Sequence, residues 1–330
     1  MAHAIGRGAA AVIFVLGLAY VLELSDSPAP LALAQPATEA RLDPILVDHA
    51  PGTGREFFVS HQRIVPLGSP FIYLPILMYH YIQPQPSIRT DALGFKLSVP
   101  PEDFAAQLDW LEAAGYHAVD FNDVRAYFEG VRPLPGNPVV ITLDDGYRDL
   151  YTAAFPILEA HHFKAVAYIV SSFVGQSRYV TRDELIEMDR AGIEIASHTV
   201  DHANLARLSY RSIMFEVAQS KRWLEQVLGH PVVDFAYPSG QFSLQAMLAV
   251  KAAGYDTAVT EQTSTVHSLD DRYAWARVRV GGGETLHDFI LSLGPKMQSV
   301  VSTTVDVEAA AGDAAPSPAI GRPALRPGTE

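Results

Sequence analysis

Two carboxylates stand side by side at the end of an apolar stretch, Pro138-Val-Val-Ile-Thr-Leu-Asp-Asp-Gly-Tyr147. An apolar run of this length that ends in Asp-Gly predicts a strand buried on both faces, with Asp144 and Asp145 at its carboxyl end. Neighbouring side chains of a strand point in different directions. One carboxylate can therefore bind a metal while the other stays free as a base. An ordinary Asp-Gly turn is the alternative.

A pair of histidines closes a second predicted strand, in Ile193-Glu-Ile-Ala-Ser-His-Thr-Val-Asp-His202. The i, i+4 spacing of His198 and His202 predicts two imidazoles stacked on one side of a helical turn, as metal ligation requires. Together with an aspartate they leave one coordination position open, which is typical of a catalytic rather than a structural zinc.

A third stretch, Phe235-Ala-Tyr-Pro-Ser-Gly240, runs from a predicted strand into a tight turn. Backbone amides exposed at such a turn can face a developing oxyanion. An ordinary turn is again the alternative.

Alternating strands and helices must position these three stretches. We expect strands that begin near Pro75, His117, Pro138, Lys164, Ile193, Val232, Asp256 and Arg277, with helices between them. Repeated strand–helix units predict a parallel sheet, and seven or eight of them favour a barrel with its chemistry at the carboxyl ends of the strands. A doubly wound open sheet is the alternative. No G-x-G-x-x-G follows the first strand, so a dinucleotide is not indicated.

The composition excludes several classes of function. The chain has 330 residues, a formal net charge of -13, 48% hydrophobic residues and no cysteine. Nucleic acid is not expected as a partner, because a phosphate-binding face needs clustered Lys and Arg. Thiol catalysis, disulfides and cysteine-ligated zinc are excluded.

Both ends of the chain differ from its centre. Residues 1–34 combine Arg7, an apolar run and an Ala-Leu-Ala site, which predicts a signal peptide or an uncleaved N-terminal membrane anchor. Either one makes the rest of the chain extracytoplasmic. Residues 35–70 are expected to be a linker or lead-in. Residues 296–330 are rich in Ala, Pro, Gly and Thr, which predicts a disordered tail.

The three stretches, together with Leu77-Met-Tyr-His80 and Asn204-Leu-Ala-Arg-Leu-Ser209, resemble the polysaccharide deacetylases of carbohydrate esterase family four. The Phe-Ala-Tyr-Pro form resembles the branch that includes poly-N-acetylglucosamine deacetylases. The resemblance implies an α/β fold, a distorted (β/α)7 barrel that forms a single catalytic domain, here expected over residues 71–295. It also implies one divalent metal ion, expected to be zinc, and hydrolysis of N-acetyl groups on an acetylated polysaccharide.

Carried over by motif, the resemblance makes Asp144 the base, makes Ser239 the donor of a backbone N–H to the oxyanion, and assigns the metal to Asp145, His198 and His202. Many members carry an arginine that orients the base at the position of Ala236 here. Arg277 or Arg279 could supply that guanidinium, or both could be surface charges.

The general acid and the substrate contacts depend on weaker signals. The family's late Leu-x-His is matched only superficially by Thr285-Leu-His-Asp288, whose His287 begins a predicted helix. His80, at the end of the first strand, is the catalytic candidate that could face the metal. Trp275 either covers an acetyl pocket or belongs to the core. The full set of expected substrate contacts is Tyr147, Tyr237, Pro238 and Trp275.

Two other functions remain open. An O-acetyl esterase acting on xylan or another cell-wall polymer would use the same ligands. A catalytically inactive carbohydrate-binding relic would have no use for both the Asp pair and the His pair. The sequence does not predict the oligomeric state.

Overall fold

The computed structural model describes residues 71–294. The predicted signal peptide or anchor, the linker and the tail lie outside these residues. Within the described part, none of the helices combines the length and apolarity needed to cross a membrane.

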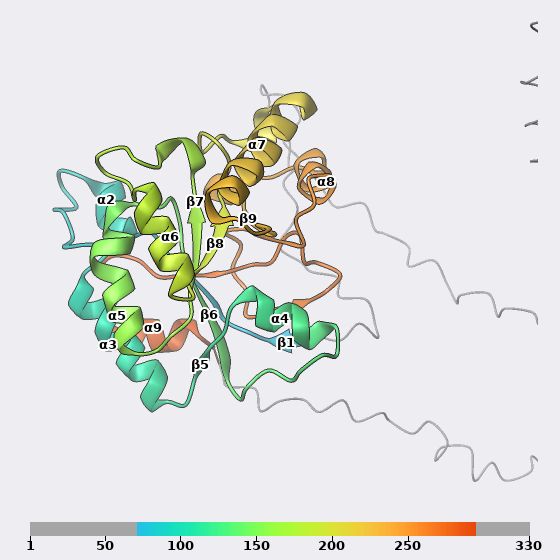
Figure 1. The fold of residues 1–330 in the computed structure, drawn as a ribbon. Coiled ribbons are helices and arrows are strands. Elements are labelled where there is room, and N and C mark those ends of the chain that lie inside the picture. Colours follow the sequence, from blue (N-terminus) through green and yellow to red (C-terminus); the bar gives the residue numbers. More distant parts are fainter. Residues whose placement is uncertain (1–70, 295–330) are drawn as a thin grey trace, which may run out of the picture. The chain divides into compact units, whose positions relative to one another are not determined.

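A parallel sheet of eight strands forms the centre of the described chain, and helices surround it (Figure 1). The strand order is β10-β9-β8-β7-β6-β2-β12, and β5 pairs with β6 beside this path. The strands are β2 (Ile76–Tyr79), β5 (His117–Ala118), β6 (Pro138–Leu143), β7 (Val166–Ile169), β8 (Glu194–Ser197), β9 (Asp234–Ala236), β10 (Thr257–Val259) and β12 (Val278–Arg279).

The two ends of this strand order meet at the segment that leads into β12. The Thr260 N–H donates to the carbonyl oxygen of Trp275 at 2.8 Å, and the Trp275 N–H donates to that of Ala258 at 2.9 Å. A few residues later Val278 pairs with Leu77 of β2. The sheet therefore curls round on itself, which confirms the predicted distorted (β/α)7 barrel, and the open doubly wound alternative is wrong.

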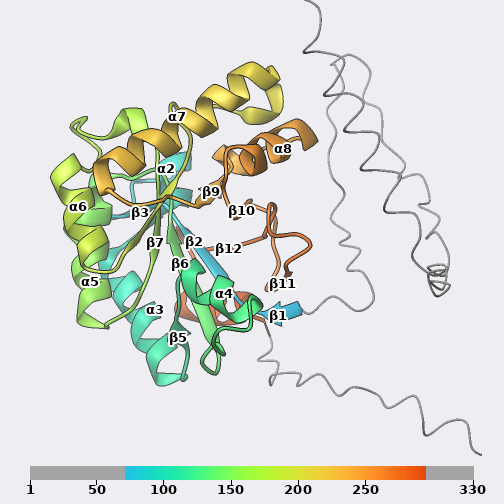
Figure 2. The same ribbon diagram turned by 45° about the vertical axis from the view of Figure 1, so that its right-hand side comes forward.

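The helices begin at residues that suit a helix N-terminus. Thr181 and Glu184 form a capping box before α6 (Arg182–Arg190), and the left-handed Gly229, with φ 83°, ends α7 (Tyr210–Leu228). The helices are α3 (Pro101–Ala113), α4 (Phe121–Phe128), α5 (Phe155–Ala160), α6 (Arg182–Arg190), α7 (Tyr210–Leu228), α8 (Leu244–Ala252) and α9 (Leu286–Ser292). In both views α3, α5 and α6 lie together on one side of the sheet, and α7 lies beside α8 (Figures 1 and 2).

Alternate side chains of the strands enter two separate apolar layers. On β2, Ile76 packs inside the barrel, whereas Leu77 packs in the outer layer between the strands and the helices. Tyr168 and Trp275 also belong to the inner layer. This filled interior leaves only the ends of the strands for polar chemistry.

Short elements complete the mouth and the base of the barrel. At the mouth, β3 (Tyr81–Ile82) pairs with β4 (Ser98–Val99), and α2 (Ala92–Leu97) lies between them in sequence. A Cβ atom at Gly282, after β12, would lie 1.7 Å from the carbonyl oxygen of Phe95, so only glycine allows this approach to α2. Elsewhere, β1 (Phe71–Tyr73) pairs antiparallel with β11 (Val266–Ser268).

Candidate active site

The predicted metal ligands Asp145, His198 and His202 come together at the carboxyl ends of β6 and β8. One donor atom from each lies within 4.8 Å of the other two. The Nε2 atoms of His202 and His198 lie 3.2 Å and 3.5 Å from Oδ1 of Asp145. Asp145 and His198 are buried, while the His202 side chain is 32% exposed, so one side of the cluster is open to solvent.

The backbone around these ligands differs from the predicted helical turn. Thr199 and His202 have φ angles of 69° and 55°, in the left-handed region that is uncommon for residues other than glycine. Asp145 is also left-handed, with a φ of 74°. The histidines meet because of a strained turn after β8, and such strain concentrates at functional sites.

Three observations fit this cluster to a divalent ion. The Nδ1 of His198 lies 2.9 Å from the carbonyl oxygen of Ala236, so Nε2 stays free to act as a ligand. Oδ1 of Asp145 is buried and has no hydrogen-bond partner. Burial lowers the pKa of His198 to about 3, which keeps its imidazole in the neutral form that binds metals.

Arg277 forms a two-point ion pair with Asp144 beside the cluster of Asp145, His198 and His202. Its two terminal nitrogens donate to the two carboxylate oxygens of Asp144, each at 2.7 Å, and both side chains are buried. The guanidinium is fixed further by Thr142 Oγ1 at 3.0 Å and by the carbonyl oxygen of Thr260 at 2.9 Å. Burial alone would raise the pKa of Asp144, but the charge and hydrogen bonds of Arg277 outweigh it and hold this pKa below its ordinary value.

The pKa of the neighbouring carboxylate, that of Asp145, shifts in the opposite direction. Burial, and then repulsion by Asp144, raise the pKa of Asp145 to about 7. Two adjacent carboxylates with such different environments are suited to different tasks.

Of the two arginines that could have replaced the missing family arginine, only Arg277 reaches Asp144. Arg279 forms an ion pair with Glu261 at the mouth, and its side chain is 40% exposed. Thr142, Thr260 and Glu261 were missed in the sequence. Of these, Thr142 could have been noticed, because it stands directly before Leu-Asp-Asp in the motif.

The two histidines considered for catalysis, His80 and His287, lie in different places. His80 is buried next to β2, its Nδ1 has no hydrogen-bond partner, and burial lowers its pKa to about 4. Asp144 and His202 are among the groups whose charges act on it. His287 lies on the exposed side of α9 and does not belong to the cluster. The structure therefore brings His80, and not His287, to the site.

Three of the four residues expected to contact substrate are buried in the structure. Trp275 is 1% exposed, packs in the barrel interior, and donates its indole N–H to the carbonyl oxygen of Ser268 at 2.8 Å. Its predicted contact with substrate is wrong, because it lies too deep. Tyr237 and Pro238 are also buried, and the Tyr237 hydroxyl donates to Tyr273. Ser239, with φ 53°, is exposed.

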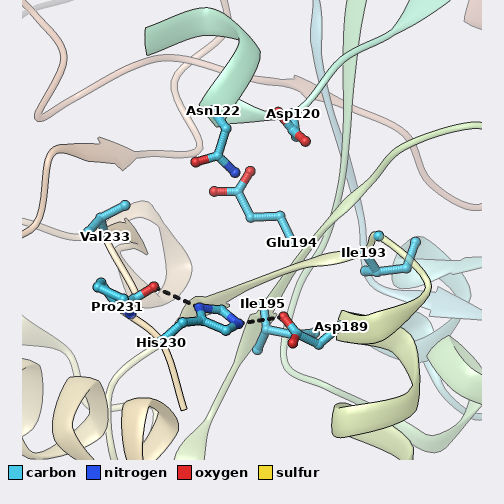
Figure 3. Close-up of a pocket in the computed structure, with 10 residues that line it drawn as sticks. Asp120, Asn122, Asp189, Ile193, Glu194, Ile195, His230, Pro231 and Val233 are labelled. Carbon is cyan, nitrogen blue, oxygen red and sulfur yellow. Dashed lines mark hydrogen bonds and ion pairs between the residues drawn. The ribbon is translucent and has the colours of Figure 1, made fainter. Parts of the chain in front are cut away.

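A hollow of about 230 Å³ lies away from this cluster, at the opposite end of the sheet (Figure 3). It is lined by Glu194, the first residue of β8, whereas His198 follows the last. Its polar groups are already paired: His230 bonds to Asp189 at 2.9 Å, and the Phe121 N–H donates to Glu194 at 2.9 Å. The candidate active site is therefore the cluster at the carboxyl ends of the strands.

Comparison with known proteins agrees with this location. The profile of the polysaccharide deacetylase family matches residues 132–258, which include Asp144, Asp145, His198, His202 and Ser239. YxkH of Bacillus subtilis, named as a polysaccharide deacetylase, is 31% identical over 210 residues, which are 64% of this chain and 72% of that protein.

Other relatives are named more specifically. The poly-beta-1,6-N-acetyl-D-glucosamine N-deacetylase of Escherichia coli K12 is 28% identical over 62% of this chain, which spans only 35% of that enzyme. The structure of the Streptococcus pyogenes deacetylase PplD in complex with acetate is 25% identical, with a TM-score of 0.63 over 68% of this chain and 99% of that one. IcaB from Ammonifex degensii, 23% identical with a TM-score of 0.59 over 67% of this chain and 97% of that one, shares the fold. By its barrel, its motifs and these relatives, the chain belongs to the polysaccharide deacetylase family.

Proposed function

We propose that this enzyme removes N-acetyl groups from an N-acetylglucosamine-containing polysaccharide, and that one divalent ion, zinc in our assignment, is held by Asp145, His198 and His202. The observation that carries the proposal is the open-sided cluster of these three ligands directly beside the Arg277–Asp144 pair. An ion bound there would polarise the acetyl carbonyl and lower the pKa of water.

The protein's own groups would handle the protons. Asp144 accepts the proton of the attacking water, and Arg277 keeps that carboxylate ionised and oriented. The proton that Asp144 takes from water then passes to the departing amine nitrogen, so the step balances, and His80, a neutral imidazole whose buried Nδ1 has no hydrogen-bond partner, is the group that we assign to relay it. The backbone N–H of Ser239 donates to the oxyanion, which the exposed turn after β9 supports.

The substrate class is supported by the relatives. Those of Escherichia coli and Staphylococcus aureus are named poly-beta-1,6-N-acetyl-D-glucosamine N-deacetylases. We also propose that residues 71–295 form the deacetylase domain and that it works outside the cytoplasm, because Arg7, the apolar run and the Ala-Leu-Ala site within residues 1–34 predict a signal peptide or tether.

A substrate panel tests the proposal. The full-length protein is stripped of metal, reloaded with zinc, and assayed on β-1,6-linked N-acetylglucosamine oligomers, chitooligosaccharides and acetylated xylan. We expect equal amounts of acetate and free amine from an N-acetylated oligomer, and only with metal. Acetate from xylan without amine would replace the proposal by an O-acetyl esterase. No release from any substrate, with zinc bound, would indicate a carbohydrate-binding relic.

A further inference from the structure

We propose that Glu216 is a positioning residue of the metal site, and that its carboxylate holds the turn between His198 and His202 in the shape that brings His202 to the ion. This proposal rests on the metal site of the proposed function. Glu216 lies in α7 and is not one of the three ligands, so it acts only through the backbone of that turn.

The turn that joins the two histidines has a strained backbone. Thr199 and His202 have φ angles of 69° and 55°. A positive φ is a genuine outlier for a β-branched residue such as Thr199, and its buried hydroxyl has no hydrogen-bond partner among the described residues. Strained conformations of this kind persist only where the surrounding structure imposes them. The turn therefore needs support from outside residues 199–202.

His202 depends on this turn more than His198 does. The Nδ1 atom of His198 lies 2.9 Å from the carbonyl oxygen of Ala236, and the His198 backbone N–H donates to the carbonyl oxygen of Ile169 at 2.9 Å. Among residues 71–294, no comparable hydrogen bond holds the ring of His202, whose side chain is 32% exposed. The position of His202 is therefore set by the backbone that precedes it.

Glu216 is the acceptor for the N–H groups of the turn. Its Oε2 atom accepts the N–H of Val200 at 3.0 Å and the N–H of Asp201 at 3.1 Å. These two residues stand between Thr199 and His202. Glu216 is buried, on a helix that packs against β8. A carboxylate forms stronger hydrogen bonds with backbone N–H groups than a neutral acceptor does, so this contact fixes the path of the turn.

The carbonyl groups of the same turn are held from the segment after β7. The Ser171 N–H donates to the carbonyl oxygen of Thr199 at 3.1 Å, and the Ser172 N–H donates to that of Val200 at 3.0 Å. These backbone bonds do not depend on which side chains the serines carry. The N–H groups of Val200 and Asp201, in contrast, depend on the single side chain of Glu216.

The experiment measures the zinc affinity of the metal-free full-length protein, of Glu216→Ala and of Glu216→Gln, by titration with zinc in competition with a chromophoric chelator. Alanine leaves both N–H groups without their acceptor, whereas glutamine keeps an oxygen in nearly the same place. Loss of a group that orients a metal ligand lowers metal affinity about 10- to 100-fold. We expect a loss in this range for Glu216→Ala and recovery of most of the affinity in Glu216→Gln.

The matched control is Glu225→Ala, in the same helix. The carboxylate of Glu225 also accepts a backbone N–H, that of Val232 at 3.1 Å, and it lies outside the ligand cluster. Its removal should leave zinc affinity equal to that of the wild type. An equal loss of zinc affinity in Glu225→Ala and Glu216→Ala would overturn the proposal, because both would then act only by weakening the fold.

Unfolding midpoints of the metal-free proteins show whether Glu216→Ala still folds. If it does not, Glu216→Asp takes its place, since it keeps the carboxylate but withdraws it by one methylene group, and it should weaken zinc binding. Wild-type zinc affinity in a folded Glu216→Ala would overturn the proposal. Failure of the wild type itself to bind zinc would instead overturn the proposed metal site.

Discussion

Arg277 binds both carboxylate oxygens of Asp144 across 133 residues of sequence, and both side chains are buried. The pair joins β6 to the segment before β12, which is where the ends of the curled sheet meet. Arg277 also donates to the carbonyl oxygen of Thr260, after β10, so the residue that orients the proposed base also links the two ends of the sheet. The family's usual arginine is replaced by Ala236, and the guanidinium arrives from another strand.

Removing this guanidinium should damage both stability and turnover. In Arg277→Gln the buried charge of Asp144 loses its partner, and breaking a buried pair costs about 3–5 kcal/mol of unfolding free energy. The pKa of Asp144 should rise towards its ordinary value or above, because burial is no longer opposed. Urea unfolding and kcat on the best substrate of the panel measure the two effects.

The matched control is Arg279→Gln, two residues further along the chain. Its ion pair with Glu261 is partly exposed, and exposed pairs contribute about 0–1 kcal/mol. Equal losses of stability in the two variants would contradict the distinction drawn between them.

Metal removal should abolish activity and leave the fold largely intact. The ligands lie at loop ends outside the two apolar layers that hold the barrel together. We expect dialysis against a chelator to eliminate acetate release, and zinc to restore it, while the far-UV circular dichroism stays unchanged. His198→Ala should not be restored by stoichiometric zinc; full metal content and activity in that variant would refute the ligand assignment.

Residues 275–280, which lead into and through β12, show what could and could not be predicted from sequence. Trp275 packs in the inner apolar layer and Arg277 is buried against Asp144, while Val278 and Val280 enter the outer apolar layer. Period-two alternation could have shown this separation. It could not show how far each residue lies from the mouth of the barrel, because that distance depends on where β12 pairs with β2. Trp275 lies deep in the core, Arg277 lies level with Asp144, and Arg279 lies at the mouth.

The histidine pair was predicted correctly from a spacing argument whose geometry was wrong. His198 and His202 do meet, but through a turn with left-handed residues rather than a helical turn. Helical and irregular turns can give the same separation in sequence. Local patterns therefore identified the residues, while the backbone that brings them together depends on contacts such as that of His198 with Ala236.

A half-buried aspartate near the mouth, Asp149, should make stability depend on pH. Burial raises the pKa of Asp149 from 3.8 to about 6 in the folded state, and one of its oxygens has no partner. Its contribution to stability is fully present below about pH 4 and is lost as pH rises through about 6. Relative to Asp149→Asn, the wild type should lose up to about 3 kcal/mol between pH 4 and pH 8. Urea unfolding of both proteins across this range measures the difference, and a constant difference would contradict the prediction.

The adjacent carboxylates should respond differently to the same substitution. Asp144→Asn preserves size but cannot accept a proton at neutral pH, so turnover should fall about 10²- to 10⁴-fold while zinc affinity stays near that of the wild type. Asp145→Asn should mainly weaken zinc binding, because a neutral amide oxygen is a poorer ligand than a carboxylate, and excess zinc should restore part of the rate. The measurement is activity against added zinc for both variants, with zinc affinity determined separately. Rescue of Asp144→Asn but not of Asp145→Asn would reverse the roles. Equal rescue of both would mean that the two carboxylates share the metal and that the base lies elsewhere in the site.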